Sequence, residues 1–154
     1  MVTDMENFAN IFSSFLEEFG SGKEMVLSTS LHDKVTSRMM SVVQNNGRFY
    51  FQTDKTFRKY NQLVHNKQVA LCTGNIQIEG TCRELGHPRE HPDFAALYQA
   101  HFPGPFKRYS SLDSTRVFEV TPTYVERWIY KEESPFVEIM DVKTQEYQLY
   151  AYHK

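Results

Sequence analysis

Apolar residues recur along the chain with two different spacings, and the changes between them predict the order of helices and strands. Near the N-terminus the spacing is helical, with apolar side chains three and four residues apart at Phe8, Ile11, Phe12, Phe15, Leu16 and Phe19. This predicts an amphipathic helix over residues 4–19, opened by a capping box of Thr3 and Glu6 and closed by Gly20. We expect its wide apolar stripe to be structural, either as a lid over a sheet or packed against a second subunit.

Between residues 25 and 82, short strand-like runs are separated by turn residues, which is typical of an antiparallel meander. Asn46-Gly47 is the clearest turn, because this dipeptide tolerates the positive φ values that a type I′ hairpin requires. The pattern predicts strands over residues 25–30, 35–43, 49–51, 69–73 and 76–82, with a helix over residues 57–66.

The rest of the chain adds one helix and further strands. The pattern predicts a helix over residues 92–101, then strands over 116–120, 124–130, 136–142 and 147–152. Residues 102–111 contain two prolines and a glycine, so we expect a long exposed connection there. Pro122 cannot donate to a ladder, which predicts a bulge or a sheet edge at that position. The fold class is therefore mainly β with peripheral helices.

Length, composition and charge limit the classes of function. The chain has 154 residues, 40% of them hydrophobic and 14% aromatic, which is enough for one domain over residues 1–154 with a real core. The net charge of −2 gives no general attraction to nucleic acid or to anionic membranes, so any anion site must be local. No apolar run approaches the roughly 20 residues of a membrane span, and the N-terminus lacks the order of a signal peptide. We expect a cytoplasmic protein.

Cysteine and histidine residues indicate no redox or metal centre. Cys72 and Cys82 fall on neighbouring predicted strands, and the apolar surroundings of Cys72 favour a reduced, packed thiol over a cross-strand disulfide. His87, His91 and His101 lack the cysteine or carboxylate spacing of a known zinc site, so we expect no metal site.

The stretch from Arg38 to Lys59 carries the strongest candidate chemistry. A polar loop after the Asn46-Gly47 hairpin delivers two hydroxyls and two adjacent cations to one end of the sheet, namely Thr53, Thr56, Arg58 and Lys59. Hydroxyls, cations and the exposed N–H groups of a first helical turn suit a phosphate monoester. The alternative is a threonine that merely caps the helix and an Arg-Lys pair on a solvated helix face.

This arrangement resembles the pyridoxamine 5′-phosphate oxidase-like family of FMN-binding split β-barrels, from about Met25 to Trp128. The resemblance is carried by Arg38-Met39-Met40, Phe51-Gln52-Thr53, Arg58-Lys59, Gln62-Leu63 with Asn66, Gln77 with Glu79-Gly80, and Pro122 with Glu126-Arg127-Trp128. It implies a six-stranded antiparallel split β-barrel that forms a homodimer with FMN at the interface. The cofactor-binding residues implied are Arg38, Met39, Met40, Ser41, Gln52, Thr53, Arg58, Lys59, Gln77 and Trp128. No catalytic side chain is required, because the flavin carries the redox chemistry.

Departures from the family pattern narrow the expected function. Ile129-Tyr130-Lys131-Glu132-Glu133 stands where the vitamin B6 oxidases carry an Arg-x-His segment for their substrate, so we do not expect a true vitamin B6 oxidase. Val43 and Phe57 replace a lysine and a serine of the family pattern.

Three functions remain open from the sequence. The first is an FMN-dependent oxidoreductase acting on a flat small molecule, with NAD(P)H as the candidate electron donor. The second is a non-catalytic flavin- or haem-binding protein of the same fold. The third is a cofactor-free dimeric interaction module.

Overall fold

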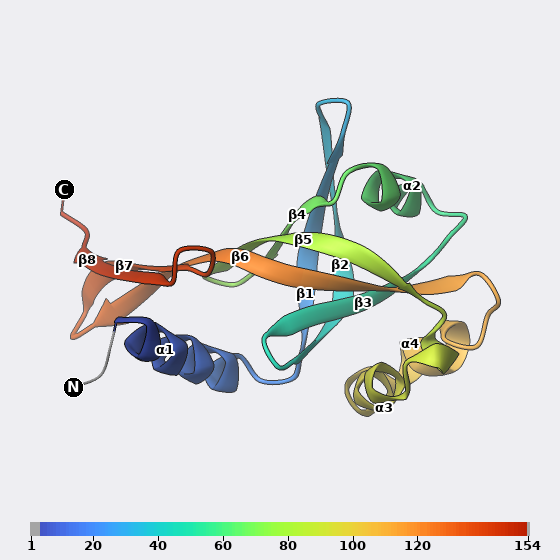
Figure 1. The fold of residues 1–154 in the computed structure, drawn as a ribbon, viewed down its shortest axis with the longest axis horizontal. Coiled ribbons are helices and arrows are strands. Elements are labelled where there is room, and N and C mark those ends of the chain that lie inside the picture. Colours follow the sequence, from blue (N-terminus) through green and yellow to red (C-terminus); the bar gives the residue numbers. More distant parts are fainter. Residues whose placement is uncertain (1–3, 154) are drawn as a thin grey trace.

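Eight strands and four α-helices make up residues 4–153, the part of the chain that the computed structural model describes (Figure 1). The strands are β1 (Gly22–Leu31), β2 (Lys34–Asn45), β3 (Arg48–Asp54), β4 (Gln68–Thr73), β5 (Ile76–Gly86), β6 (Thr115–Lys131), β7 (Ser134–Asp141) and β8 (Glu146–Ala151). The helices are α1 (Asp4–Phe19), α2 (Arg58–His65), α3 (Pro92–His101) and α4 (Pro103–Tyr109), with a 3-10 turn η1 (Pro88–Glu90).

Six of the strands close into an antiparallel barrel, which confirms the predicted fold. The strand order is β3-β2-β1-β4-β5-β6, and pairing of β3 with β6 closes the ring. β6 is long enough to serve two parts of the molecule, since residues 115–120 pair with β3 and residues 124–131 pair with β7. Residues 124–131 of β6, together with β7 and β8, therefore extend from the barrel as an arm (Figure 1).

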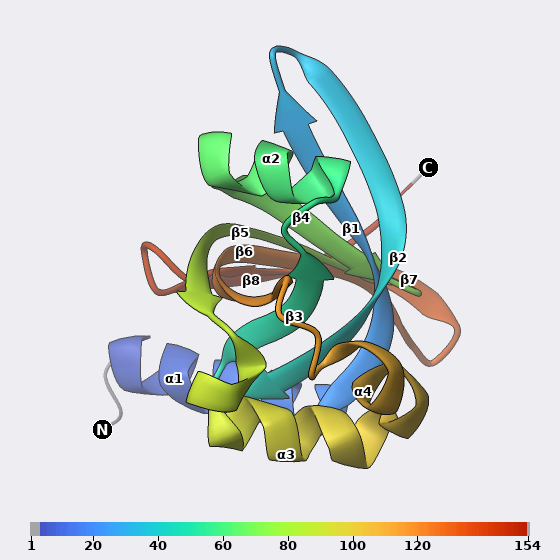
Figure 2. The ribbon, with the colours of Figure 1, turned by 90° about the vertical axis from the view of Figure 1, so that its right-hand side faces the viewer.

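The barrel is split between β2 and β3. β2 pairs with β1 through residues 34–43 but with β3 only through Val43, Gln44 and Asn45. Residues 34–42 of β2 consequently have one edge without a strand partner in the described part of the chain. In Figure 2, α2 lies above the end of the barrel that faces the viewer, and α3 and α4 lie below it.

Aromatic side chains fill the barrel, and α1 covers its end as a structural lid. Phe49, Phe51 and Phe118 are fully buried inside. In the α1 stripe Phe8, Phe15 and Phe19 are buried and the other three residues are partly buried. The Phe19 ring meets the Phe49 ring edge-on, with 5.2 Å between the ring centroids. The predicted capping box of Thr3 and Glu6 lies outside the side chains that the structure describes.

Two local predictions are confirmed by the backbone. Asn46 and Gly47 have φ values of 53° and 82°, as a type I′ turn requires. Pro122 lies at a bulge, because the pairing register with β5 shifts there. Gly80, opposite Pro122, is required by space, since a Cβ atom would lie 2.6 Å from the Thr121 carbonyl oxygen.

Our prediction for residues 102–111 was wrong, because α4 occupies most of that segment. Its prolines lie in the first helical turn, where the N–H groups have no intrahelical partner, so the helix loses little by their presence.

The predicted packing of Cys72 was also wrong. Its side chain is exposed on β4, whereas Cys82 is buried, and both are free thiols. Burial raises the pKa of the Cys82 thiol to about 11. Within residues 4–153, no helix is both long and apolar enough to cross a membrane.

Candidate functional site

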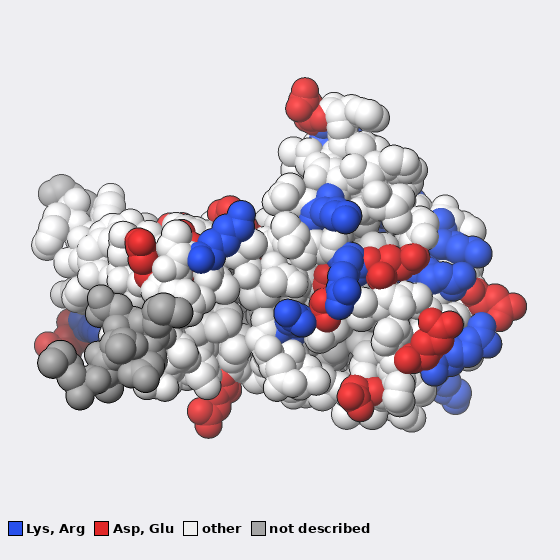
Figure 3. Space-filling view, in the orientation of Figure 1, with Lys and Arg blue, Asp and Glu red and all other residues white. Residues whose placement is uncertain are grey.

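Three cations gather at the split end of the barrel. Arg58 and Lys59 begin α2, and Arg38 projects from β2 toward the same helix. None of the three forms an ion pair among the described residues. Basic and acidic side chains are interspersed on the face shown in Figure 3, which carries no broad patch of one sign.

Within this cation cluster, burial and neighbouring positive charges lower the pKa values of Lys59 and Arg38. Burial lowers the pKa of Lys59, and the nearby charge of Arg38 lowers it further, while Asp54 acts in the opposite direction. Burial also lowers the pKa of Arg38, followed by the charge of Arg58. A bound anion would relieve this mutual repulsion, because an opposite charge favours the charged form of each group.

A cavity of about 330 Å³ lies beside Lys59, and one of its lining residues has a hydroxyl without a hydrogen-bond partner. It is lined by Gln52, Thr53, Asp54, Phe57, Lys59, Tyr98, Tyr109, Leu112 and Thr115. Thr53 is only 6% exposed, and its Oγ1 is the one buried side-chain polar atom of the described residues without a hydrogen-bond partner. Buried polar groups normally have partners, so this hydroxyl points to a ligand atom.

Asp54 organises the loop that leads into α2. Its Oδ1 accepts hydrogen bonds from the Thr56 N–H (2.8 Å) and hydroxyl (2.7 Å), and its Oδ2 accepts one from the Ser114 hydroxyl (2.6 Å). The Ser114 bond, followed by the two Thr56 bonds, lowers the pKa of Asp54. Thr56 is therefore turned toward Asp54, so of the two threonine hydroxyls that the sequence offered for the site only that of Thr53 lacks a partner among the described residues. The Asp-x-Thr spacing before the helix was a readable signal for this turn.

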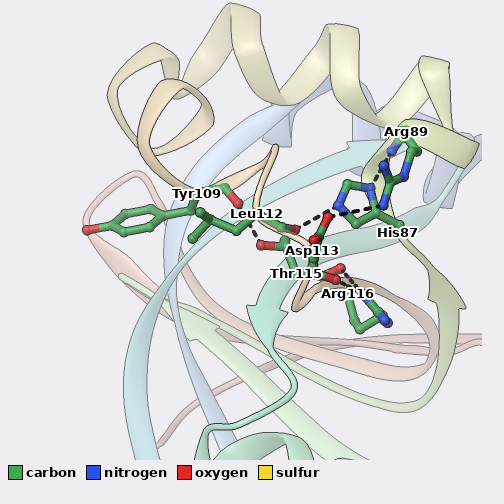
Figure 4. Close-up of polar contacts among 7 residues, drawn as sticks. All are labelled: His87, Arg89, Tyr109, Leu112, Asp113, Thr115 and Arg116. Carbon is green, nitrogen blue, oxygen red and sulfur yellow. Dashed lines mark hydrogen bonds and ion pairs between the residues drawn. The ribbon is translucent and has the colours of Figure 1, made fainter.

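The segment after α4 is held against the barrel by backbone contacts (Figure 4). The Arg89 N–H donates to His87 Nδ1 (3.0 Å), so His87 carries its proton on Nε2 and donates it to the Leu112 carbonyl (2.8 Å). The Thr115 hydroxyl donates to the Tyr109 carbonyl (2.6 Å). These bonds fix Leu112 and Tyr109 at the rim of the cavity, where both side chains remain exposed.

The histidines that we considered as metal ligands bind other groups instead. His91 contacts the Leu85 carbonyl (2.6 Å) and His101 contacts the Ser21 hydroxyl (2.7 Å), while His87 holds Leu112. Residues 4–153 contain no group of three histidine, cysteine or acidic side chains arranged to hold a metal ion.

Residues 14–129 match the sequence model of the family described as pyridoxamine 5′-phosphate oxidase. The chain belongs to this family. No curated protein matches the sequence.

Solved structures with low sequence identity share the fold of this pyridoxamine 5′-phosphate oxidase family member. A pyridoxamine 5′-phosphate oxidase-related, FMN-binding protein from Nostoc punctiforme PCC 73102 is 13% identical, with a TM-score of 0.59 over 96% of this chain and 94% of that one. Campylobacter jejuni ChuZ is 8% identical, with a TM-score of 0.64 over 90% and 59%. HutZ, a haem storage protein from Vibrio cholerae, is 14% identical, with a TM-score of 0.57 over 79% and 91%.

The residues that the family resemblance implied are divided between two places in the protomer. Arg38, Thr53, Arg58 and Lys59 meet at the split, and Met40 packs against the barrel core. Gln52 lines the cavity and accepts a hydrogen bond from the buried Ser110 hydroxyl (2.9 Å).

The other implied residues lie on the outer face of the sheet. Met39, Gln77 and Trp128 are all exposed there, and cross-strand pairing through Val26 and Cys72 places Met39 and Gln77 in one row. Trp128 stands on the arm against Tyr152, with 5.1 Å between ring centroids. Ser41 is half-buried near Tyr98. Within one protomer, Gln77 and Trp128 therefore do not join the cation cluster.

Proposed function

We propose that the chain is an FMN-binding oxidoreductase whose cation cluster holds the phosphate of the flavin. The observation that carries the proposal is the buried, unpaired hydroxyl of Thr53, a residue that lines the same cavity as Lys59. A phosphate dianion would accept hydrogen bonds from that hydroxyl and from the unpaired cations Lys59 and Arg58. Such charge-assisted hydrogen bonds are among the strongest in proteins. The solvated-helix alternative does not account for a buried hydroxyl without a partner.

The split supplies the other half of the proposed site. The free edge of β2 presents backbone N–H and C=O groups over residues 36–41, next to the cation cluster. A flavin ring lying along this edge would find hydrogen-bond partners for its polar atoms. FMN would supply the electron transfer, and this chain's residues would bind and orient it.

The purified protein gives the first test. We expect a flavin absorbance spectrum that bleaches on anaerobic addition of NADH or NADPH. Lys59→Ala should weaken FMN binding by about tenfold to a hundredfold and leave riboflavin binding almost unchanged, because charge-assisted bonds contribute about 1.5–3 kcal/mol. Lys67→Ala, which removes an exposed lysine outside α2, is the matched control. Equal losses for FMN and riboflavin, or no loss for either, would refute the phosphate assignment.

A homodimer is part of this proposal. The outer face of the sheet carries Met39, Gln77 and Trp128, and neither α1 nor α2 covers it. Tyr130 and Tyr150 add exposed aromatic surface on the arm, 70% and 48% exposed. Two copies joined through this face would bury it and bring Trp128 to a partner's split. Sedimentation at micromolar concentration should show a species of twice 18.1 kDa, and a species of 18.1 kDa alone would overturn the dimer.

The proposed substrate is a flat, mostly apolar molecule that stacks on the exposed face of the flavin. The rim of the cavity is apolar and aromatic, with Tyr109, Phe57 and Leu112 each about half exposed. Such surfaces bind planar rings. Efficient oxidation of pyridoxamine phosphate would contradict this substrate class.

Haem binding is the second candidate, favoured by the structural similarity to HutZ. The cation cluster would then bind the carboxylates of the haem. His87, His91 and His101 are engaged by backbone or side-chain partners, which leaves them unsuited as axial ligands without rearrangement. A Soret band in the absorbance spectrum of the purified protein would support haem binding and refute the flavin proposal. A colourless protein whose spectrum does not change when FMN is added would indicate an interaction module.

A further inference from the structure

A network of buried and half-buried polar side chains adjoins the cation cluster and shares Arg38 with it. It consists of Thr29 on β1, Thr36 and Arg38 on β2, and Gln62 on α2, and we call it the anchor cluster. Gln62 is 3% exposed, and its Oε1 accepts hydrogen bonds from Thr29 Oγ1 (2.7 Å), Thr36 Oγ1 (3.0 Å) and Arg38 Nη2 (3.1 Å). One carbonyl oxygen thus connects the β1–β2 hairpin to α2.

Most of the N–H donors of the Arg38 guanidinium form hydrogen bonds within this cluster. Nη1 donates to the Leu27 carbonyl (3.1 Å) and to Thr29 Oγ1 (2.9 Å), and Nη2 donates to Thr36 Oγ1 (2.7 Å) and to Gln62. A guanidinium has five N–H donors, and these four bonds leave only the Nε–H. A two-pronged contact of Arg38 with a phosphate would therefore break at least one of the bonds that hold it.

α2 depends on such an external anchor. It has only eight residues, its N-cap residue Phe57 makes no side-chain capping bond, and its first turn contains no acidic residue. Short helices without caps have little stability of their own. Gln62 follows Lys59 and Arg58 by three and four residues, so the three side chains share one face of the helix. Fixing Gln62 therefore fixes the orientation of the helix face that carries both cations.

We infer that Arg38 is a positioning residue, which holds α2 through Gln62 so that Arg58 and Lys59 face the split. In this arrangement the two α2 cations bind the anion, and Arg38 acts only through its hydrogen bonds to the β1–β2 hairpin and to α2. The identity of the anion as the FMN phosphate rests on the proposed function. The anchor itself rests on contacts that need no ligand.

A double-mutant cycle on ligand affinity distinguishes this role from direct binding. Gln62→Leu and Arg38→Met should each weaken FMN binding by about fivefold to tenfold or more, the effect of losing one or two hydrogen bonds, and change riboflavin binding less than twofold. Because both residues act through one contact, the double variant should be no weaker than the weaker single variant. Additive losses, or normal FMN binding by Gln62→Leu, would overturn the inference.

Arg38→Lys provides the sharper single change. It keeps the positive charge but cannot form the four guanidinium bonds. If Arg38 positions α2, Arg38→Lys should bind FMN as weakly as Arg38→Met. If the lysine variant retained wild-type affinity, the charge alone would be sufficient and the positioning role would be refuted.

Hydrogen exchange without ligand tests the anchor independently of FMN. Gln62→Leu and Arg38→Met should both speed exchange of the α2 amides, while Asn61→Ala, an exposed change on the same helix, should not. Slow, wild-type exchange in both anchor variants would overturn the inference. A wild-type protein that fails to bind FMN would instead refute the proposed function, and the exchange result would still decide the role of Arg38.

Discussion

Replacing Thr53 by valine should raise the stability of the free protein and lower its affinity for FMN. The Thr53 hydroxyl is buried without a partner, and such a group costs about 1–3 kcal/mol in the folded state. Valine has nearly the same shape and leaves no polar atom unsatisfied. We therefore expect Thr53→Val to increase the free energy of unfolding by about 1 kcal/mol or more, which raises the melting temperature by about 2–4 °C in a domain of this size.

The same substitution removes a donor to the bound phosphate. A hydrogen bond to a charged group contributes about 1.5–3 kcal/mol, so FMN should bind roughly tenfold to a hundredfold more weakly, with riboflavin affinity almost unchanged. Thermal unfolding of the ligand-free protein and fluorescence titration with both flavins measure the two effects. Thr73→Val, at the end of β4 and outside the cavity, serves as the control. A loss of both stability and affinity would refute the reasoning, because it would show that Thr53 has a partner within the protein.

Two further predictions concern the barrel wall and the arm. Gly80→Ala should destabilise the fold by about 1–3 kcal/mol in denaturant unfolding, because the new Cβ would meet the Thr121 carbonyl. Gly104→Ala in α4 meets nothing within 4 Å and should raise stability by about 0.5–1 kcal/mol, so a similar loss in both variants would contradict the steric argument. Burial, followed by the hydrogen bond to Glu126, raises the pKa of Tyr124 to about 12. The folded state therefore keeps this proton where the unfolded state loses it, and stability should fall as the pH rises from about 10 toward 12. Tyr124→Phe should flatten that fall in unfolding curves measured across this range, and an unchanged slope would contradict the assignment.

Local sequence signals were sufficient to predict most of the helices, strands and turns. The Asn46-Gly47 turn, the α1 stripe and the interruption at Pro122 depend on neighbouring residues, and each was found where it was expected. α4 was missed because prolines usually interrupt helices, and the sequence alone did not show that Pro103 begins a new one. The exposed Cys72 was missed for a related reason, since an apolar run does not tell which face of a strand is covered.

The candidate site was only partly predictable. The hydroxyl of Thr53 and the cations Arg58 and Lys59 were predictable from the sequence because they follow one another in a single loop and helix. Closure of the barrel by β3 and β6 joins segments about 65 residues apart in sequence and leaves no local signal. The contact of Arg38 with Gln62 likewise connects a strand to a helix 24 residues later, so the role of Gln62 emerged only from the packing.

Three unfavourable features coincide at the split, and one kind of ligand would relieve all of them. Arg38, Arg58 and Lys59 repel one another, the Thr53 hydroxyl lacks a partner, and β2 leaves part of its edge unpaired. If Lys59 and the Thr53 hydroxyl were only packing defects, removing either would stabilise the free protein without further consequence. At a binding site, removing either would stabilise the free protein and weaken the complex, because the ligand uses the groups that the fold leaves unsatisfied. Opposite changes in stability and affinity at several of these positions are therefore stronger evidence for a phosphate-bearing planar ligand than the loss of affinity at any single one.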